Sequence, residues 1–128
     1  MNDTDKDPKP LSDAPLLSDV PHSSVANGKS RPVVRAGEVL SELLAAPVLP
    51  GLYLVATPIG HLGDISLRAL ALLEGADFVA AEDTRHSRKL LQHYGISTEM
   101  ISYHDHNGDQ MRPKIIRMIK EGRAIALI

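Results

Sequence analysis

Residues Gly51–Ser66 read GLYLVATPIGHLGDIS, and this stretch decides the fold. An apolar, β-branched run stops at Thr57, and a loop with two glycines leads to a helix-start signal at Ser66. This order predicts a buried strand, a turn open to close approach, and a helix. In an open α/β sheet, the first strand-to-helix loop lies at the carboxyl ends of the strands, where ligands bind. We therefore expect a site at this loop.

Strand and helix patterns alternate from residue 51 onward. The expected strands cover 52–56, 78–81, 100–103 and 124–128, and the helices between them cover 66–74, 85–93 and 112–121. Gly75, Gly95 and Gly122 should each end one helix. Pro113 should lie in the first turn of the last helix, because an interior proline costs about 3 kcal/mol. Apolar strands alternating with helices predict an α/β fold, a mostly parallel open sheet with helices on both faces.

The N-terminal part of the chain has a different composition. Residues 1–35 mix acids, lysines and prolines, which predicts a disordered leader that buries too little apolar surface to offset its ordering. Residues 36–50 predict a short amphipathic helix and a linker. Residues 51–128 form the α/β domain. Because the fourth strand reaches the end of the sequence, we expect a truncated N-terminal domain of a longer enzyme.

Composition narrows the class of protein. The 128 residues suit one domain, and a formal net charge of −2 argues against a strongly basic nucleic-acid coat. The chain has no cysteine, which excludes disulfides and thiolate zinc sites. No apolar run approaches the roughly 20 residues of a membrane span, and the N-terminus lacks a signal-peptide pattern. We expect a cytoplasmic protein. Neither the dinucleotide fingerprint G-x-G-x-x-G nor the P-loop motif occurs.

Polar side chains collect after the first three predicted strands. Because the carboxyl ends of parallel strands meet at one edge, we expect these three turns to share a rim and form half of a cleft. The residues are Thr57, His61 and Asp64 after the first strand, Glu82–His86 after the second, and His104–Asn107 after the third.

Some of these residues also have a purely structural interpretation. Asp83 or Thr84 and Asn107 can cap helix starts, and Asp64 can either cap the first helix or contact a ligand. Solvated helix faces account for most of the basic residues, whereas Arg85, at the site edge, is suited to a phosphate.

The run His104-Asp105-His106 has two interpretations of its own. Both histidines meet one metal ion only if the segment bends. Hydrogen bonding to a polar substrate is the favoured alternative.

Three stretches carry a family resemblance: LYLVATPIGHLGDIS, AAEDTRHSRKLLQHYGI and YHDHN. In this order and spacing they resemble the start of the tetrapyrrole-methylase superfamily. Within it they are most similar to bacterial enzymes that methylate a cytidine 2′-hydroxyl in small-subunit (16S) ribosomal RNA. The resemblance implies an S-adenosylmethionine-dependent methyltransferase with two α/β domains, usually a homodimer. This chain would supply the N-terminal domain.

The resemblance also suggests roles for the residues of the three turns. Asp64 is expected to accept or orient the hydroxyl proton, with Glu82 second and His104 third. The cofactor loop would include Thr57, Pro58 and Gly60. No metal is expected. The RNA-binding side would comprise His61, Arg85, His86, Asp105, His106 and Asn107.

Three rival functions stay open at this point. One is a metal-dependent hydrolase built on the His104–His106 run. Another is an inactive RNA-binding or dimerisation module. A relative acting on a tetrapyrrole is a third, although the EDTRH and HDHN groups argue against it.

Overall fold

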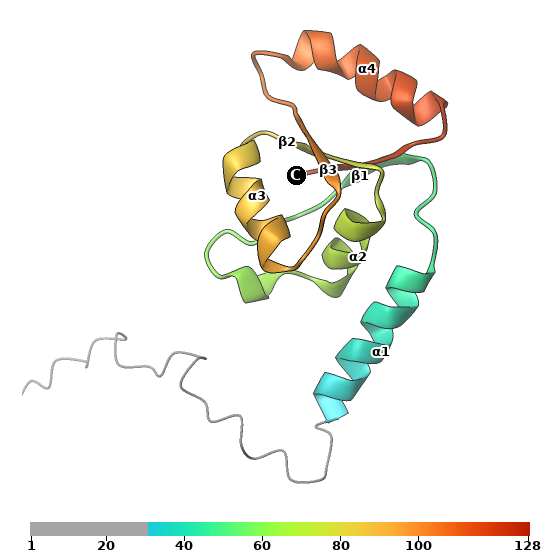
Figure 1. The fold of residues 1–128 in the computed structure, drawn as a ribbon, viewed down its shortest axis with the longest axis vertical. Helices are drawn as coiled ribbons and strands as arrows, with labels where there is room; N and C mark the ends of the chain where they lie inside the picture. The colour runs from blue at the N-terminus through green and yellow to red at the C-terminus, as the bar shows by residue number, and fades with distance from the viewer. Residues whose placement is uncertain (1–30) are drawn as a thin grey trace, which may run out of the picture. The chain divides into compact units, whose positions relative to one another are not determined.

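The computed structural model describes residues 31–128, which form one compact unit. Most of the predicted leader, residues 1–30, lies outside the described residues. The described part contains four strands and four α-helices (Figure 1). The strands are β1 (Gly51–Leu54), β2 (Phe78–Ala81), β3 (Glu99–Ser102) and β4 (Ala124–Leu127). The helices are α1 (Arg31–Ala45), the 3-10 turn η4 (Leu62–Asp64), α2 (Leu67–Gly75), α3 (Thr84–His93) and α4 (Gly108–Lys120).

The four strands form one open sheet in the order β1-β4-β2-β3, and every pair is parallel. The register aligns Leu127 with Leu54 on one side and with Ala80 on the other. Ala81 in turn pairs with Ser102. The carboxyl ends of all four strands therefore lie along one edge, as the sequence predicted.

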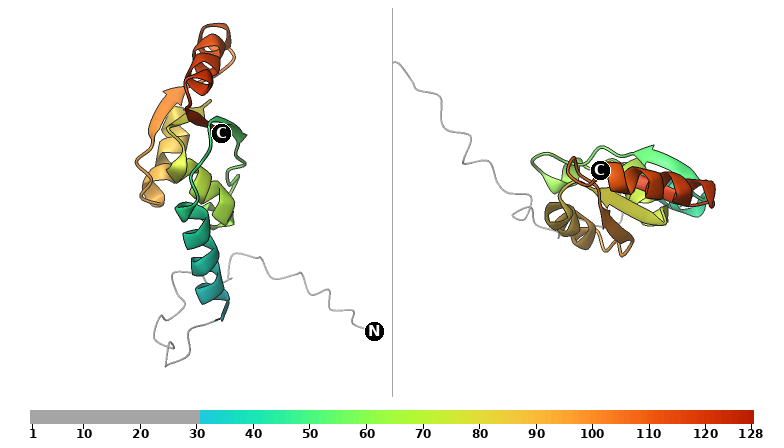
Figure 2. Two further views of the ribbon diagram at one scale, coloured as in Figure 1. Left: turned by 90° about the vertical axis from the view of Figure 1, so that its right-hand side faces the viewer. Right: turned by 90° about the horizontal axis from the view of Figure 1, so that it is seen from above.

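Helices cover both faces of the sheet, which confirms the predicted fold class. On one face, Leu73 of α2 and Leu91 of α3 pack against Val79 and Ala126. On the other face, Ile115 of α4 packs against the neighbouring strand residues Ala80 and Ile125, whose side chains point the opposite way. The connection from β3 to β4 runs back across β2, opposite in direction to the two earlier connections. Because crossovers between parallel strands keep one handedness, this reversal places α4 on the face opposite α2 and α3. Figure 2 shows the separation of α4 from the other helices.

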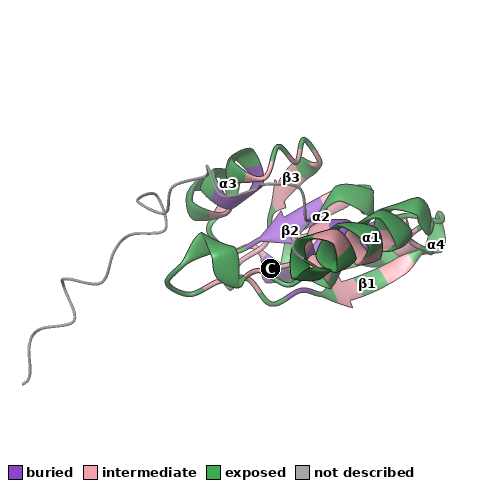
Figure 3. Cartoon of the chain, turned by 90° about the horizontal axis from the view of Figure 1, so that it is seen from below, coloured by how far each residue is buried: buried purple, intermediate pink, exposed green. Residues whose placement is uncertain are grey.

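Burial is concentrated in the central strands. Val79, Ala80 and Ala81 of β2 and Ile125 and Ala126 of β4 are fully buried. Figure 3 shows β2 as the buried centre of the sheet, with exposed helix surfaces around it. The two central strands thus form a rigid base for the turns that leave the carboxyl edge.

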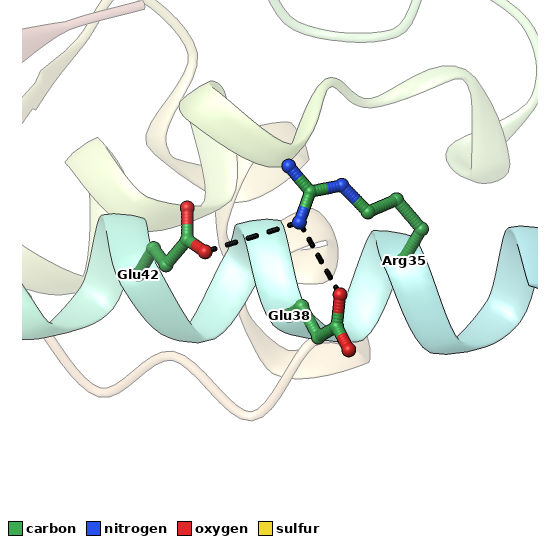
Figure 4. Close-up of polar contacts among 3 residues, drawn as sticks. All are labelled: Arg35, Glu38 and Glu42. Atoms are coloured by element: carbon green, nitrogen blue, oxygen red, sulfur yellow. Dashed lines mark hydrogen bonds and ion pairs between the residues drawn. The ribbon is translucent and has the colours of Figure 1, made fainter.

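Helix α1 begins at Arg31, so the predicted limit of the disordered leader at residue 35 is wrong. Pro32 lies in the first turn, where a proline needs no hydrogen-bond partner for its nitrogen. The helix packs against α2. On its exposed surface, Arg35 lies 3.2 Å from Glu38 and 4.0 Å from Glu42 (Figure 4). Such exposed ion pairs contribute little to stability.

Helix α4 starts four residues earlier than predicted, at Gly108. The carbonyl of Asn107 accepts hydrogen bonds from the backbone nitrogens of Gln110 and Met111, which form the extra first turn. Pro113 therefore lies inside the helix rather than in its first turn. The sequence prediction relied on the preference of proline for the first turn of a helix and did not anticipate these two backbone hydrogen bonds.

The three predicted helix-ending glycines divide into two kinds. Gly95 and Gly122 have φ angles of 69° and 90° just after α3 and α4, as predicted for such ends. Gly75 is instead the last residue of α2, without a positive φ. A Cβ atom there would lie 2.6 Å from Cγ2 of Val48, so close packing of the α1–β1 connection explains this glycine.

Within residues 31–128, no helix has the length and apolarity needed to cross a membrane.

Candidate functional site

A pocket of about 390 Å³ opens where β2, β3 and β4 end. We call it the strand-end pocket. Its polar side chains come from the turn after β2, the turn after β3, and the first turns of α4. The lining residues are Glu82, Tyr103, His104, Asp105, Gly108, Arg112, Leu127 and Ile128. The sequence prediction thus correctly brought together Glu82, His104 and Asp105.

The His104 side chain has an unusual environment in this pocket. Its Nδ1 atom is buried and has no hydrogen-bond partner within the described residues. A buried polar atom without a partner costs about 1–3 kcal/mol, so folded proteins rarely leave one unpaired. This Nδ1 atom has almost no accessible surface, so a group in the pocket can partner it only if the imidazole turns. Among the pocket residues, His104 is therefore the one whose side chain has an unmet hydrogen bond.

Asn107 fixes the backbone of the turn that carries His104. Its Oδ1 accepts a hydrogen bond from the His104 backbone nitrogen at 2.8 Å, and its Nδ2 donates to the Ser102 carbonyl at 3.0 Å. Its side chain makes no cap hydrogen bond to α4, so the predicted capping role is wrong. The side-chain amide is occupied inside the protein, which disfavours the predicted RNA contact and assigns Asn107 a positioning role.

The turn after β3 bends, as a shared metal site would require. The Asn107 nitrogen donates to the His104 carbonyl at 3.1 Å, closing the turn. The rings of His104 and His106 meet edge to face, with centroids 5.9 Å apart. Across residues 31–128, however, no three His, Cys, Asp or Glu side chains form a group able to hold a metal ion. This arrangement does not favour the hydrolase alternative.

The turn after β2 is held by Asp83. Its Oδ1 accepts hydrogen bonds from the backbone nitrogens of Arg85 and His86, both at 3.0 Å, which confirms the predicted cap of α3. The hydrogen bond from His86 is the main reason that the pKa of Asp83 is below its usual value. Arg85 does not line the strand-end pocket but lines a separate groove on α3. His86 is exposed and does not line the strand-end pocket.

The loop after β1 leaves the same edge of the sheet but does not line the strand-end pocket. Tyr94, at the C-terminal end of α3, donates a hydrogen bond from its Oη atom to the Leu62 carbonyl at 2.8 Å. This bond ties η4 to the end of α3 that is opposite Arg85, as Figure 1 shows for the short green turn below α3. Asp64 is exposed in η4 and does not line the strand-end pocket. Asp64 and Arg85 thus do not line the strand-end pocket with His104, and a common site for the three residues stays a prediction.

The other predicted site residues of this loop do not line the strand-end pocket, and His61 has its hydrogen-bond partner within the loop. Nδ1 of His61 accepts a hydrogen bond from the Gly63 nitrogen at 3.0 Å. Ser66, and not Asp64, caps α2 by accepting from the Ala69 nitrogen at 3.0 Å. The predicted cofactor residues Thr57, Pro58 and Gly60 do not line the strand-end pocket.

Sequence analysis missed Arg112 as a pocket residue. The sequence places it among the basic residues of the last helix, most of which a solvated helix face explains. With the actual start at Gly108, Arg112 lies one turn into α4 and reaches back over Gly108, 3.7 Å from where a Cβ would stand. Its guanidinium also lies 3.5 Å from the fully exposed Asp109. Asn107 was a candidate for a helix start, but nothing in the sequence indicated that its backbone carbonyl begins α4 at Gly108.

Comparison with known proteins identifies relatives of this fold. Residues 51–126, more than half of the chain, match the family described as Tetrapyrrole (Corrin/Porphyrin) Methylases. A Mesorhizobium japonicum protein named "Ribosomal RNA small subunit methyltransferase I" is 53% identical over 88 residues, which cover 69% of this chain and 30% of the relative. The Escherichia coli O157:H7 protein of the same name is 49% identical over 77 residues, 60% of this chain and 27% of the relative.

A third protein with this name, from Erythrobacter litoralis, is 55% identical over 75 residues, 59% of this chain and 27% of the relative. This chain thus spans about three tenths or less of the length of these relatives. The family match includes all three turns at the carboxyl edge of the sheet, and the parallel α/β architecture agrees with it. The chain belongs to the tetrapyrrole (corrin/porphyrin) methylase family.

Proposed function

We propose that this chain supplies the N-terminal α/β part of an S-adenosylmethionine-dependent methyltransferase that acts on a cytidine 2′-hydroxyl in small-subunit rRNA. The observation that carries the proposal is the 49–55% identity to proteins named for small-subunit rRNA methylation. The 2′-hydroxyl of cytidine, as the methylated group, rests on the resemblance of the AEDTRH and HDHN segments to that branch of the family. Because the chain spans only part of these relatives, the activity is assigned to the whole enzyme.

Methyl transfer to a hydroxyl requires alignment and proton removal. Holding two reactants in line can contribute about 7–11 kcal/mol to the reduction of the barrier. A well-placed base contributes about 10²–10⁴-fold more. S-adenosylmethionine would supply the methyl group when bound. The task that falls to this chain is to hold the ribose and accept or orient the proton of its hydroxyl.

Glu82 and His104 are the residues best placed for that task, because both line the strand-end pocket. If the imidazole turns, the unpartnered Nδ1 of His104 is suited to a hydrogen bond with a ribose or base edge. Arg112, in the same pocket, offers a bidentate donor to a phosphate. We rank Asp64 after these residues, because it lies on η4 outside the pocket.

The proposal extends to partners and location. The substrate would be 16S rRNA within the small ribosomal subunit, encountered in the cytoplasm. The whole enzyme would act as a homodimer, with its remaining part completing the methyl-donor site. A second candidate function is RNA binding without catalysis by this chain alone. It is favoured by the position of Thr57, Pro58 and Gly60 outside the strand-end pocket.

Transfer of labelled methyl groups to undermethylated small subunits tests the proposal. We compare the 128-residue chain with a chimera in which residues 51–128 replace the matching part of the Escherichia coli relative. The proposal expects labelled rRNA with the chimera. A folded, dimeric chimera that transfers no label to rRNA would refute it, and transfer by the isolated chain would refute the need for the remaining part.

A further inference from the structure

The outer face of α3 carries a second cavity, a groove of about 350 Å³ lined by Thr84, Arg85, Arg88, Lys89 and Gln92. We call it the α3 groove. The three cations lie at positions i, i+3 and i+4, which places them on one side of the helix. The opposite side carries the buried Leu90 and Leu91. The cations therefore project from the surface into one shallow depression.

Across residues 31–128 these cations form no ion pair, although the Asp83 carboxylate at the start of α3 interacts with the charge of Arg85. Helix α3 contains no acidic residue, and the nearby Asp83 carboxylate is occupied by backbone amides. The whole chain has a net charge of −2, so the groove is a local concentration of positive charge rather than a result of basic composition.

Positive charge near the N-terminal end of α3 destabilises this helix. The N-terminal end of a helix dipole is positive, and added positive charge there is unfavourable. Arg85 is the second residue of α3, and Arg88 follows one turn later. A bound anion would relieve both the repulsion among the cations and their repulsion by the dipole. This balance points to an anionic ligand for the groove.

We propose that the α3 groove binds consecutive phosphates of the RNA backbone next to the methylation site. The inference rests on the proposed function, which supplies the RNA. Arg85 and Lys89 are separated by about 6 Å along the helix, so each can meet a different one of two neighbouring phosphates. Threonine and glutamine side chains, present at Thr84 and Gln92, also contact phosphates in nucleic-acid complexes.

The groove is suitably placed for this role. Thr84 lines the groove and Glu82 lines the strand-end pocket, and a single residue separates them in the chain. Their Cα atoms can therefore be at most about 7 Å apart. Phosphates held on α3 would fix the register of the strand, while the pocket receives the nucleotide beside them.

RNA binding by the 128-residue chain at several salt concentrations tests the inference. The probe is a labelled oligonucleotide from small-subunit rRNA, and a peptide nucleic acid of the same sequence is the probe without backbone charge. The test variant combines Arg85→Gln, Arg88→Gln and Lys89→Gln. The matched control combines Lys114→Gln, Arg117→Gln and Lys120→Gln, three exposed cations on α4. Both variants lose the same charge and keep similar helix propensity.

The groove variant should bind RNA about 10- to 100-fold more weakly at low salt, and its plot of log K against log salt should flatten by about 2. The α4 control should bind like the unsubstituted chain, and the peptide nucleic acid should bind to none of them. Thermal unfolding of the groove variant should occur at the same temperature or higher, because the helix dipole then faces less positive charge.

Two other results would overturn the inference in different ways. Equal RNA affinity of the groove variant and the α4 control would reject the groove and leave the proposed rRNA substrate standing. Equal binding of RNA and peptide nucleic acid would also reject it, since backbone charge would then play no part. Absence of RNA binding by the unsubstituted chain would reject the groove together with RNA recognition by this part of the enzyme, whereas methyl transfer by the chimera tests the proposed function separately.

Discussion

The side-chain amide of Asn107 holds the backbone of His104 in place, with Oδ1 accepting from the His104 nitrogen at 2.8 Å. The same side chain donates to the Ser102 carbonyl at 3.0 Å, so it joins the end of β3 to the start of α4. Asn107 thereby fixes the backbone of a residue that lines the strand-end pocket and whose buried Nδ1 has no partner within residues 31–128.

Replacement of Asn107 by alanine should lower the free energy of unfolding by about 1–2 kcal/mol, because the partly buried His104 nitrogen loses its acceptor. Urea denaturation of the 128-residue chain measures this change. His106→Ala is the control, since His106 is exposed in the same turn. In the chimera, Asn107→Ala should reduce methyl transfer more than His106→Ala does. Equal stability of the two variants would show that the amide does not hold the turn.

Asp77 provides a second test of the fold, at the other end of the sheet. Its Oδ2 accepts from the buried Ala124 nitrogen at 2.8 Å, and its Oδ1 accepts from Arg123 at 3.0 Å. Asp77→Ala should therefore destabilise the chain by about 1–2 kcal/mol, because the Ala124 amide loses its partner. The control is Asp109→Ala, whose carboxylate is fully exposed and contributes little. Similar unfolding midpoints for both variants would contradict this account of the β2–β4 connection.

The acid sensitivity of the fold follows from Asp77 and Asp83. The hydrogen bond from Ala124, assisted by Arg123, holds the pKa of Asp77 below its ordinary value of 3.8, and the amides of α3 do the same for Asp83. A carboxyl whose pKa is lower in the folded state contributes stability above its unfolded pKa, and this stability is lost as pH falls through the folded pKa. Stability should thus be insensitive to these groups above about pH 5 and should decline below about pH 4.

Denaturation of Asp77→Asn across the same pH range isolates one of these two contributions. The variant should lose stability near neutral pH and should show a shallower decline in acid. A decline as steep as that of the unsubstituted chain would mean that Asp77 is not a source of the acid sensitivity.

Much of the fold was predictable because the local signals agreed. The apolar runs gave all four strands to within two residues, and the Asp83 cap gave the start of α3. The start of α4 was missed because its first turn depends on the Asn107 carbonyl, a backbone group that leaves no mark in residue type. Pro113 was therefore expected in the first turn of the helix, although it lies in the interior of α4.

The candidate site was predictable only in part. Parallel pairing guarantees that strand ends share an edge, and so Glu82 and His104 were correctly placed together. The path of a long loop is set by tertiary contacts instead. The hydrogen bond from Tyr94 to Leu62 links residues 32 positions apart and carries Asp64 away from the pocket, and no local pattern encodes such a bond.

The relative importance of Glu82 and Asp64 can be measured in the chimera. Glu82→Gln should reduce turnover by about 10²–10⁴-fold with RNA affinity little changed, if its carboxylate handles the hydroxyl proton. Asp64→Asn should have the smaller effect, because η4 lies outside the pocket. The opposite order, with Asp64→Asn the more damaging change, would return Asp64 to first place among the candidates. It would also require the loop after β1 to move in the whole enzyme.

Analysis of rRNA nucleosides tests the central claim most directly. The chimera carrying residues 51–128 is expressed in an Escherichia coli strain without its own copy of the matching relative, and small-subunit rRNA is digested and examined by mass spectrometry. The account predicts that the chimera adds a 2′-O-methyl group to a cytidine of small-subunit rRNA and that the Glu82→Gln chimera does not. Well-folded chimera that leaves the cytidine unmethylated, or that methylates a different group, would contradict it.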